Sequence, residues 1–246
     1  MKNLAQCYDL VFGNTQQDLY FYQSFIEAHQ PALEIGSGTG RLLLAYLKHG
    51  FKVEGIEPNQ ENNSLLLQKS RSLNLKPLIY SQNLQELNLD KKYKLIYLPL
   101  YIFQNIIDRA DAVNSLKLIY NHLEKNSLIL ISIFIPWNDP TGTWEGTWRL
   151  RASAVDLQNN EIINCSESLV FDKFEQIQTK QIKYDLFSNN ILNQSLLMKL
   201  QFRCYSRFEL TMMLELAGFK DIEIFGDYAL QEASSSSECF IFKAIK

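Results

Sequence analysis

Short apolar runs alternate with helix-like segments along the first half of the chain. Five runs have the length and composition of buried strands, and they lie at residues 32–36, 51–57, 77–80, 93–98 and 128–135. Four segments repeat apolar residues at helical spacing, and they lie at residues 16–29, 38–49, 60–73 and 110–123. Strands that alternate with helices at this spacing form βαβ units, so the pattern predicts a parallel sheet.

The pattern changes after Pro136. Residues 144–205 alternate apolar and polar side chains, most clearly over Met198–Cys204. Polar turn clusters interrupt this alternation at 156–160, 172–173 and 188–190. Such alternation is typical of an antiparallel sheet with one wet face and a turn at each polar cluster.

A capped helix and two strands are predicted near the end of the chain. Ser206 is a residue type favoured at helix N-caps, Glu209 follows three residues later, and Gly218 is a typical helix stop. These signals predict a helix over 206–217. The closing strands are expected near 219–226 and 238–244.

The length and composition indicate a globular chain. With 246 residues, of which 46% are hydrophobic and 21% charged, one large domain with an insertion is favoured over two independent domains. We expect the main domain to comprise residues 1–136 and 206–246, and the inserted antiparallel sheet to comprise residues 137–205.

The charge pattern limits the partners. The formal net charge is −3 and no basic run stands out, which argues against nucleic acid as the main partner. The longest apolar run, Leu128–Ile135, is too short to cross a bilayer. The segment Met1–Asp9 is interrupted by polar residues and an acid where a signal peptide needs an apolar core, so a cytoplasmic location is expected.

The cysteines and histidines do not suggest a metal centre. Cys7, Cys165, Cys204 and Cys239 are far apart and form no C-x-x-C pair, so we interpret them as buried or half-buried thiols. The three histidines all fall near the ends of predicted helices, where a polar or cationic role at the helix end explains them. No metal site is therefore expected.

The chemistry of the chain is concentrated between the first strand and the first helix that follows it. Gly36, Gly38 and Gly40 stand at alternate positions there, where a sharp turn and a close ligand favour residues without a Cβ. A dinucleotide fingerprint of the form G-x-G-x-x-G would need glycine at position 41, which is Arg41. With Glu34 two residues ahead, the G-x-G-x-G pattern instead favours S-adenosylmethionine (SAM).

An acid follows the second predicted strand at the matching distance. Glu57 lies 21 positions after Gly36 and ends the strand at 51–57. In a βαβ unit, that position places a carboxylate where two ribose hydroxyls of a nucleotide cofactor would donate hydrogen bonds.

These motifs resemble those of the class I SAM-dependent methyltransferases, and the resemblance covers most of the chain. It rests on Glu34–Arg41, on Glu57-Pro58, on Pro99 with Phe103, and on the segment Tyr205–Phe219. The inserted sheet resembles that of the small-molecule branch, the sugar-amine and small-amine N-methyltransferases. The resemblance implies an α/β, Rossmann-like, doubly wound fold with a mostly parallel seven-stranded sheet and an antiparallel closing hairpin.

The resemblance also implies which residues bind SAM. They are Tyr8, Tyr22, Glu34, Gly36, Ser37, Gly38, Glu57, Pro58, Asn83, Leu84 and Leu98. Gly36–Gly38 would lie against the methionine and ribose, and Glu57 would take the ribose hydroxyls, with Pro58 beside the adenine. The backbone carbonyl of Leu98 would lie near the methionine end. Tyr8 and Tyr22 match aromatic residues that close over the cofactor in relatives, although Tyr22 fits equally well as a core residue on its helix.

Two positions depart from the family pattern. Relatives usually have Asp where Asn83 stands. The Asn side-chain carbonyl can still accept a hydrogen bond from the adenine amino group, but it carries no charge. Relatives often have His where Asn105 stands, and Asn cannot act as a general base. Leu98, ahead of Pro99, also lacks the polar side chain that DNA and protein-amide methyltransferases use to hold their amine.

The expected function is transfer of a methyl group from SAM to a small-molecule N or O nucleophile, by proximity and in-line positioning. Candidate acceptor-side residues are Tyr101, Asn105, Trp137, Arg149 and Arg151. Trp137 fits equally as a lid, and either arginine as a solvated strand charge. The inserted sheet is expected to contact the acceptor or a second copy of the chain, with a homodimer left open.

Two alternative functions remain. One is a non-catalytic SAM-binding or scaffold protein that keeps the fold, which Asn83 and Asn105 favour. The other is a nicotinamide-dependent oxidoreductase, which Arg41 and the antiparallel tail disfavour.

Overall fold

The computed structural model describes residues 1–136 and 146–246. The chain divides into two compact units. The larger unit comprises Gln16–Ile135 and Cys204–Lys246, and the smaller comprises Met1–Thr15 and Pro136–Arg203.

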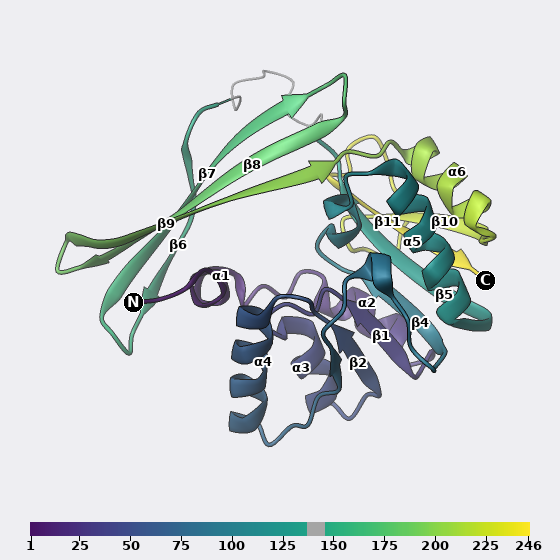
Figure 1. Cartoon of the computed structure of the whole chain (residues 1–246), viewed down its shortest axis with the longest axis horizontal. Helices are drawn as coiled ribbons and strands as arrows, with labels where there is room; N and C mark the ends of the chain where they lie inside the picture. The colour runs from purple at the N-terminus through teal and green to yellow at the C-terminus, as the bar shows by residue number, and fades with distance from the viewer. Residues whose placement is uncertain (137–145) are drawn as a thin grey trace. The chain divides into compact units, whose positions relative to one another are not determined.

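The larger unit is built on a seven-stranded sheet in the order β10-β11-β5-β4-β1-β2-β3 (Figure 1). Its strands are β1 (Ala32–Ile35), β2 (Val53–Ile56), β3 (Ile79–Tyr80), β4 (Tyr93–Leu98), β5 (Leu123–Phe134), β10 (Lys220–Gly226) and β11 (Cys239–Ile245). Strands β1 to β5 pair in parallel, whereas β11 runs antiparallel to both β5 and β10. The expected parallel sheet with an antiparallel closing hairpin is therefore confirmed.

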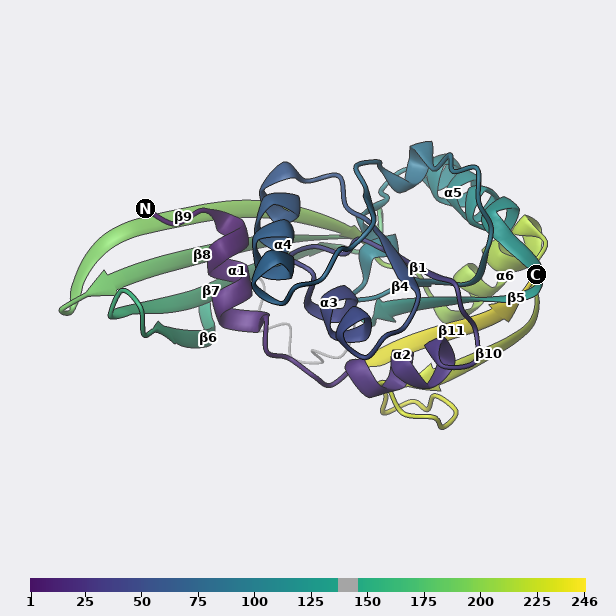
Figure 2. The ribbon, with the colours of Figure 1, turned by 90° about the horizontal axis from the view of Figure 1, so that it is seen from below.

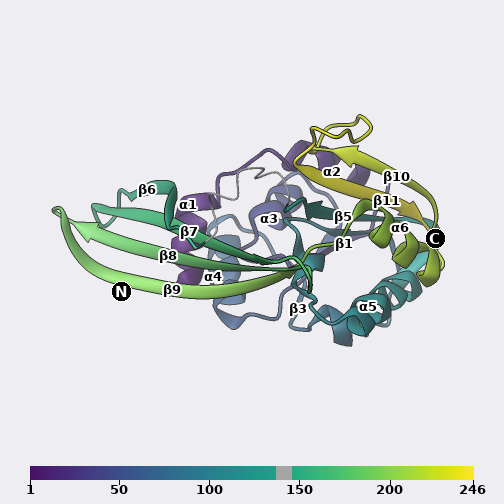
Figure 3. The same ribbon diagram turned by 90° about the horizontal axis from the view of Figure 1, so that it is seen from above.

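Helices cover both faces of this sheet, so that α2 and α5 lie on opposite sides of it (Figures 2 and 3). One face packs against α2 (Leu19–Ile26), α3 (Arg41–Lys48) and α4 (Gln60–Ser72). The other packs against α5 (Arg109–His122) and α6 (Arg207–Ala217). Residues 95–98 of β4 alternate between the two cores because strand side chains have a period of two.

The predicted ends of α6 are confirmed. The Ser206 hydroxyl accepts the backbone N–H of Glu209 at 3.1 Å. Gly218 follows the helix with φ of 102°, a left-handed conformation that suits glycine at a helix C-terminus.

The smaller unit contains the inserted antiparallel sheet, in the order β6-β7-β8-β9 (Figure 3). Its strands are β6 (Arg149–Asp156), β7 (Glu161–Asp172), β8 (Ile177–Ser188) and β9 (Ile191–Arg203). The three turns between them coincide with the three polar clusters predicted from the sequence. Each cluster ends one run of alternating side chains because turn residues adopt conformations that a strand cannot continue.

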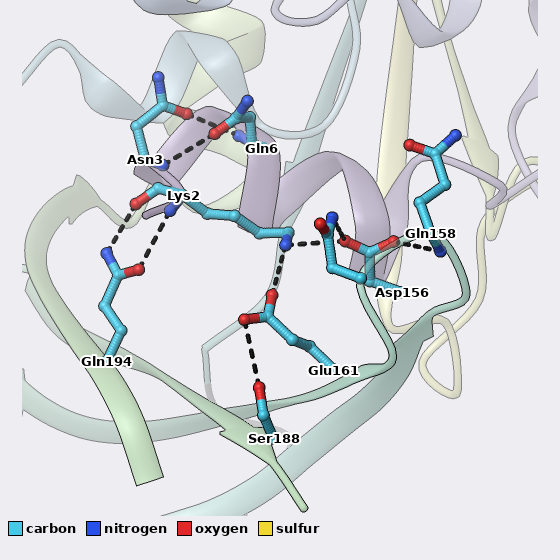
Figure 4. Close-up of polar contacts among 9 residues, drawn as sticks. Lys2, Asn3, Gln6, Asp156, Gln158, Glu161, Ser188 and Gln194 are labelled. Carbon is cyan, nitrogen blue, oxygen red and sulfur yellow. Dashed lines mark hydrogen bonds and ion pairs between the residues drawn. The ribbon is translucent and has the colours of Figure 1, made fainter.

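Helix α1 (Leu4–Phe12) also belongs to this unit and was not predicted from the sequence. Cys7 packs against Ile163, Cys165 and Tyr184 of the sheet. The Lys2 ammonium lies 2.7 Å from Asp156 Oδ2 and 2.5 Å from Glu161 Oε2 (Figure 4).

The backbone around Lys2 is held as well. Its N–H donates to Gln194 Oε1 at 3.0 Å, and Gln194 Nε2 donates to its carbonyl oxygen at 2.7 Å (Figure 4). These contacts explain why residues 1–15 group with the inserted sheet. The expected boundaries had placed them in the main domain, and the structure differs there.

Candidate functional site

The glycine turn connects the end of β1 to the start of α3. The N–H groups of Gly36 and Ser37 both donate to the Ile56 carbonyl, at 2.8 and 2.9 Å, which ties the turn to the end of β2. Gly36, Gly38 and Gly40 have φ of 76°, 55° and 84°. These left-handed conformations account for glycine at all three positions.

The three glycines differ in what surrounds them. A Cβ on Gly36 would lie 2.8 Å from the Ile102 side chain, and one on Gly40 would lie 2.8 Å from Leu66. A Cβ on Gly38 would meet nothing within 4 Å. Gly36 and Gly40 are thus required by packing within the protein, whereas Gly38 has open space in which a ligand can approach the backbone.

Glu57 lies beside Gly38 at the end of β2. Its Oε2 accepts the Gly38 N–H at 2.8 Å, and its Oε1 accepts Asn59 N at 2.8 Å and Asn62 Nδ2 at 3.3 Å. A carboxylate offers about four acceptor positions, so Oε2 can accept a further donor. The predicted pairing of the glycine turn with an acid therefore exists in space. Pro58, next to it, is exposed.

Glu34 lies in the core, where it faces other side chains. It is buried, and the Tyr97 hydroxyl donates to its Oε2 at 2.6 Å. Burial raises the pKa of Glu34 to about 8, although the Tyr97 hydrogen bond opposes this shift.

Ser37 also directs its side chain into the protein. Its hydroxyl is buried and lies 2.2 Å from the place that a Cβ on Gly55 would occupy. Gly55 is thus required in β2 to leave room for Ser37. The side chain of Ser37 faces β2, so this residue presents only its backbone to a ligand above the turn.

Asn83 and Leu84 follow β3. Asn83 is exposed, and its side chain does not cap the 3₁₀ helix Leu84–Glu86 that begins after it. Leu84 is buried in the core. Of these two residues, Asn83 alone presents a polar side chain at the surface.

The segment after β4 is held by Ser132 of β5, a residue that sequence reasoning did not single out. The Ser132 hydroxyl donates to the Leu98 carbonyl and accepts the Tyr101 N–H, both at 3.2 Å. Leu100 and Tyr101 have φ of 48° and 66°, uncommon for residues with a Cβ. The Leu98 carbonyl, expected near the methionine, thus already accepts one protein donor.

Gln104 is the buried polar residue of the next segment, the 3₁₀ helix Ile102–Asn105. Its side-chain amide accepts the Phe134 N–H at 2.8 Å and donates to the Phe134 carbonyl at 3.4 Å. Asn105, which sequence reasoning singled out, is exposed. The Tyr101 ring packs on Phe134 with 5.3 Å between centroids.

Tyr22 is a fully buried residue of α2. Its ring centroid lies 5.2 Å from that of Tyr97 and 5.9 Å from that of Tyr228. Within the residues that the structure describes, the buried hydroxyls of Tyr22 and Tyr228 have no hydrogen-bond partner. Burial raises the pKa of both phenols, so they remain neutral.

Arg41 pairs with α2. Its guanidinium makes two hydrogen bonds of 2.6 Å to the two carboxylate oxygens of buried Asp18. The sequence used Arg41 only to argue against a dinucleotide fingerprint. Its structural role is to join the start of α3 to the start of α2.

The remaining candidates belong to the smaller unit. Tyr8 is half-buried on α1, and its ring centroid lies 5.5 Å from that of Phe12. Arg149 stands opposite Glu167 in the β6–β7 register, and Arg151 Nε lies 3.8 Å from a Glu167 carboxylate oxygen. Trp137 lies outside the described residues.

All four cysteines are free and buried, as predicted. Across residues 1–136 and 146–246, no helix is long and apolar enough to span a membrane. In the same described ranges, no three His, Cys, Asp or Glu side chains are grouped to hold a metal ion.

The fold is similar to that of solved methyltransferases. A SAM-dependent methyltransferase from Clostridium acetobutylicum matches with a TM-score of 0.81 and 18% identity, over 98% of this chain and 96% of that one. DesVI from Streptomyces venezuelae matches with a TM-score of 0.77 and 11% identity, over 100% and 99%. CalS10, an amino pentose methyltransferase from Micromonospora echinaspora with SAM bound, matches at 0.73 and 12%, over 100% and 99%.

No protein-family model and no curated protein matches the sequence. At these identities, the likeness to solved structures shows the fold alone. The chain has the α/β, Rossmann-like fold of these SAM-dependent methyltransferases, as the resemblance implied.

Proposed function

We propose that this protein is a SAM-dependent methyltransferase that acts on a small-molecule N or O nucleophile. The observation that carries the proposal is the pairing of Gly38 with Glu57. Open space above a left-handed glycine adjoins a buried carboxylate with a free acceptor position, at the carboxyl ends of neighbouring parallel strands. Ligands of open α/β sheets bind at such a place.

The residues at this edge fit the cofactor. Glu57 would accept a ribose hydroxyl, Asn83 would accept the adenine amino group, and Gly38 would let the ligand lie against the backbone. When bound, SAM supplies an electrophilic methyl group on a sulfonium. The protein would contribute orientation and exclusion of water, for which Ser132 and Gln104 hold the segment after β4 in a fixed geometry.

On the acceptor side we propose a role for Tyr101 of the larger unit, and the role of Arg149 on the inserted sheet stays a separate prediction. A neutral amine is already a nucleophile, so it would need no general base, which agrees with Asn105 in the place of His. The names of the similar structures support this class: CalS10 is an amino pentose methyltransferase, and KedS8 is a sugar N-methyltransferase.

The test of the cofactor is ligand-dependent thermal stability. SAM and S-adenosylhomocysteine should raise the melting temperature by an amount that grows with ligand concentration, whereas NAD and NADP should not. Gly38→Val should abolish the shift because its side chain would fill the ligand space.

Gly50→Val is the matched control. Gly50 also has a left-handed φ, 82°, and open space around its Cβ position, but it lies past the end of α3. Both variants carry similar backbone strain, and only Gly38→Val should lose the response to SAM. Stabilisation of the wild type by NAD and not by millimolar SAM would reject the proposal.

The second candidate is a non-catalytic SAM-binding protein, which Asn83 and Asn105 favour because Asn105 cannot act as a general base and Asn83 offers the adenine only an uncharged acceptor. The discriminating measurement is S-adenosylhomocysteine release with a panel of amines, amino-sugars and hydroxylated metabolites. Saturable release supports the enzyme. No release across the panel, together with tight SAM binding, supports the non-catalytic protein.

A further inference from the structure

Helix α6 is apolar on two opposite faces. Leu210, Met213, Leu214 and Ala217 are buried against the larger unit. On the outer side, Phe208, Met212 and Leu216 are 70%, 56% and 72% exposed. A helix with one packed face normally turns polar residues outward, so a second apolar face on the outer side indicates that this face is also covered.

The three exposed residues form a continuous stripe. They are spaced four residues apart, so each lies about one turn along the helix and about 40° around it from the last. Single exposed apolar residues are common, but three aligned side chains of this size on one helix indicate a contact surface. We call this surface, Phe208 with Met212 and Leu216, the α6 stripe.

Opposite charges lie at the two ends of the stripe. The Arg207 guanidinium sits 5.5 Å from the Phe208 ring centre, over the N-terminal end. Glu215 is exposed beside Leu216 at the C-terminal end. Viewed down the helix, Arg207 lies about 100° and Glu215 about 20° to the same side of Phe208. Both charges therefore flank the stripe on one side.

We propose that the α6 stripe binds the α6 stripe of a second copy of this chain, as an antiparallel pair around a two-fold axis at Met212. In that arrangement Phe208 of each copy faces Leu216 of the other, and Met212 faces its own counterpart. A two-fold contact is self-complementary by construction. The proposal concerns assembly, and it does not depend on the proposed enzymatic function.

The charges match this pairing. Along the helix axis, Arg207 lies about 7.5 Å to one side of Met212, and Glu215 lies about 4.5 Å to the other side. The two-fold axis reverses these offsets, so Arg207 and the partner's Glu215 come within about 3 Å of each other along the axis on the same flank. In a parallel pair, Arg207 and the partner's Glu215 would instead lie about 12 Å apart along the axis. One helix pair is smaller than the roughly 1,200 Å² of a standard stable interface, so the dimer should be weak.

Sedimentation velocity of the full chain from micromolar to millimolar concentration tests the proposal. The average mass of the wild type should rise toward twice that of the monomer. Met212→Glu, which places two carboxylates together on the axis, should remain monomeric. Leu230→Glu is the matched control, since Leu230 is 64% exposed but outside the stripe, and it should associate like the wild type.

A charge swap and a cysteine cross-link identify the geometry. Arg207→Glu and Glu215→Arg should each weaken association, and the double variant should restore it. All native cysteines are buried, so a bis-maleimide should react only with an introduced thiol. A short bis-maleimide should link Met212→Cys to its counterpart in the dimer but should not link Leu230→Cys. Thermal unfolding by circular dichroism verifies that each variant is folded. A wild type that stays monomeric throughout, or a Met212→Glu variant that associates equally, would overturn the proposal.

Discussion

At the scale of single residues, Glu34 should make stability depend on pH. Its pKa is raised by burial from 4.5 to about 8, so between these values the folded chain holds a proton that the unfolded chain releases. Stability from this group is complete below 4.5 and is lost as pH rises toward 8, with a slope of up to about 1.4 kcal/mol per pH unit. Glu34→Gln should therefore gain stability relative to the wild type over that range.

The measurement is the free energy of urea unfolding from pH 5 to pH 9. The difference between Glu34→Gln and the wild type should grow up to about pH 8 and then level off. Glu86→Gln, at an exposed position of the same unit, should show no such trend. Parallel curves for Glu34→Gln and the wild type would contradict the assignment of Glu34 as a buried, protonated acid.

At the scale of elements, Gln104 should contribute more to the free energy of unfolding than its neighbour Asn105. Gln104→Leu removes both side-chain hydrogen bonds to the end of β5 and should cost about 1–3 kcal/mol of unfolding free energy. Asn105→Ala changes an exposed side chain and should cost less than about 0.5 kcal/mol. Chemical denaturation of the two variants checks this order, and equal losses would refute it.

The same segment shows how far the sequence can predict this protein. Periodicity identified the strands and helices of the larger unit because each pattern is local. The glycine turn and Glu57 were predicted because a βαβ unit fixes their separation. Ser132 and Gln104 were not predicted as supports, since their partners lie about 30 residues away and no local pattern marks such contacts. Helix α1 was missed because its packing partners come from the distant β7 and β8.

At the scale of the whole molecule, each of the two units should respond separately to the loss of its own contacts. Lys2→Met removes the cation between Asp156 and Glu161 and leaves two neighbouring carboxylates unpaired. Hydrogen exchange should then quicken in α1 and in the β6–β7 hairpin. Exchange in the seven-stranded sheet should stay as in the wild type. Lys52→Met, at an exposed lysine of the larger unit, is the control and should leave α1 unchanged.

The pH at which protonation of Asp156 breaks its ion pair with Lys2 gives a second test of the same prediction. The Lys2 ammonium beside Asp156 holds the pKa of that carboxyl at about 2, below its usual 3.8. A lowered carboxyl pKa contributes stability that is present above 3.8 and is lost as pH falls through 2. Wild-type α1 should thus remain protected at pH 4 and lose protection near pH 2, whereas in Lys2→Met it should already be weak at pH 7. Equal protection of α1 in both proteins at pH 7 would show that Cys7 and its apolar neighbours hold the helix without the ion pairs.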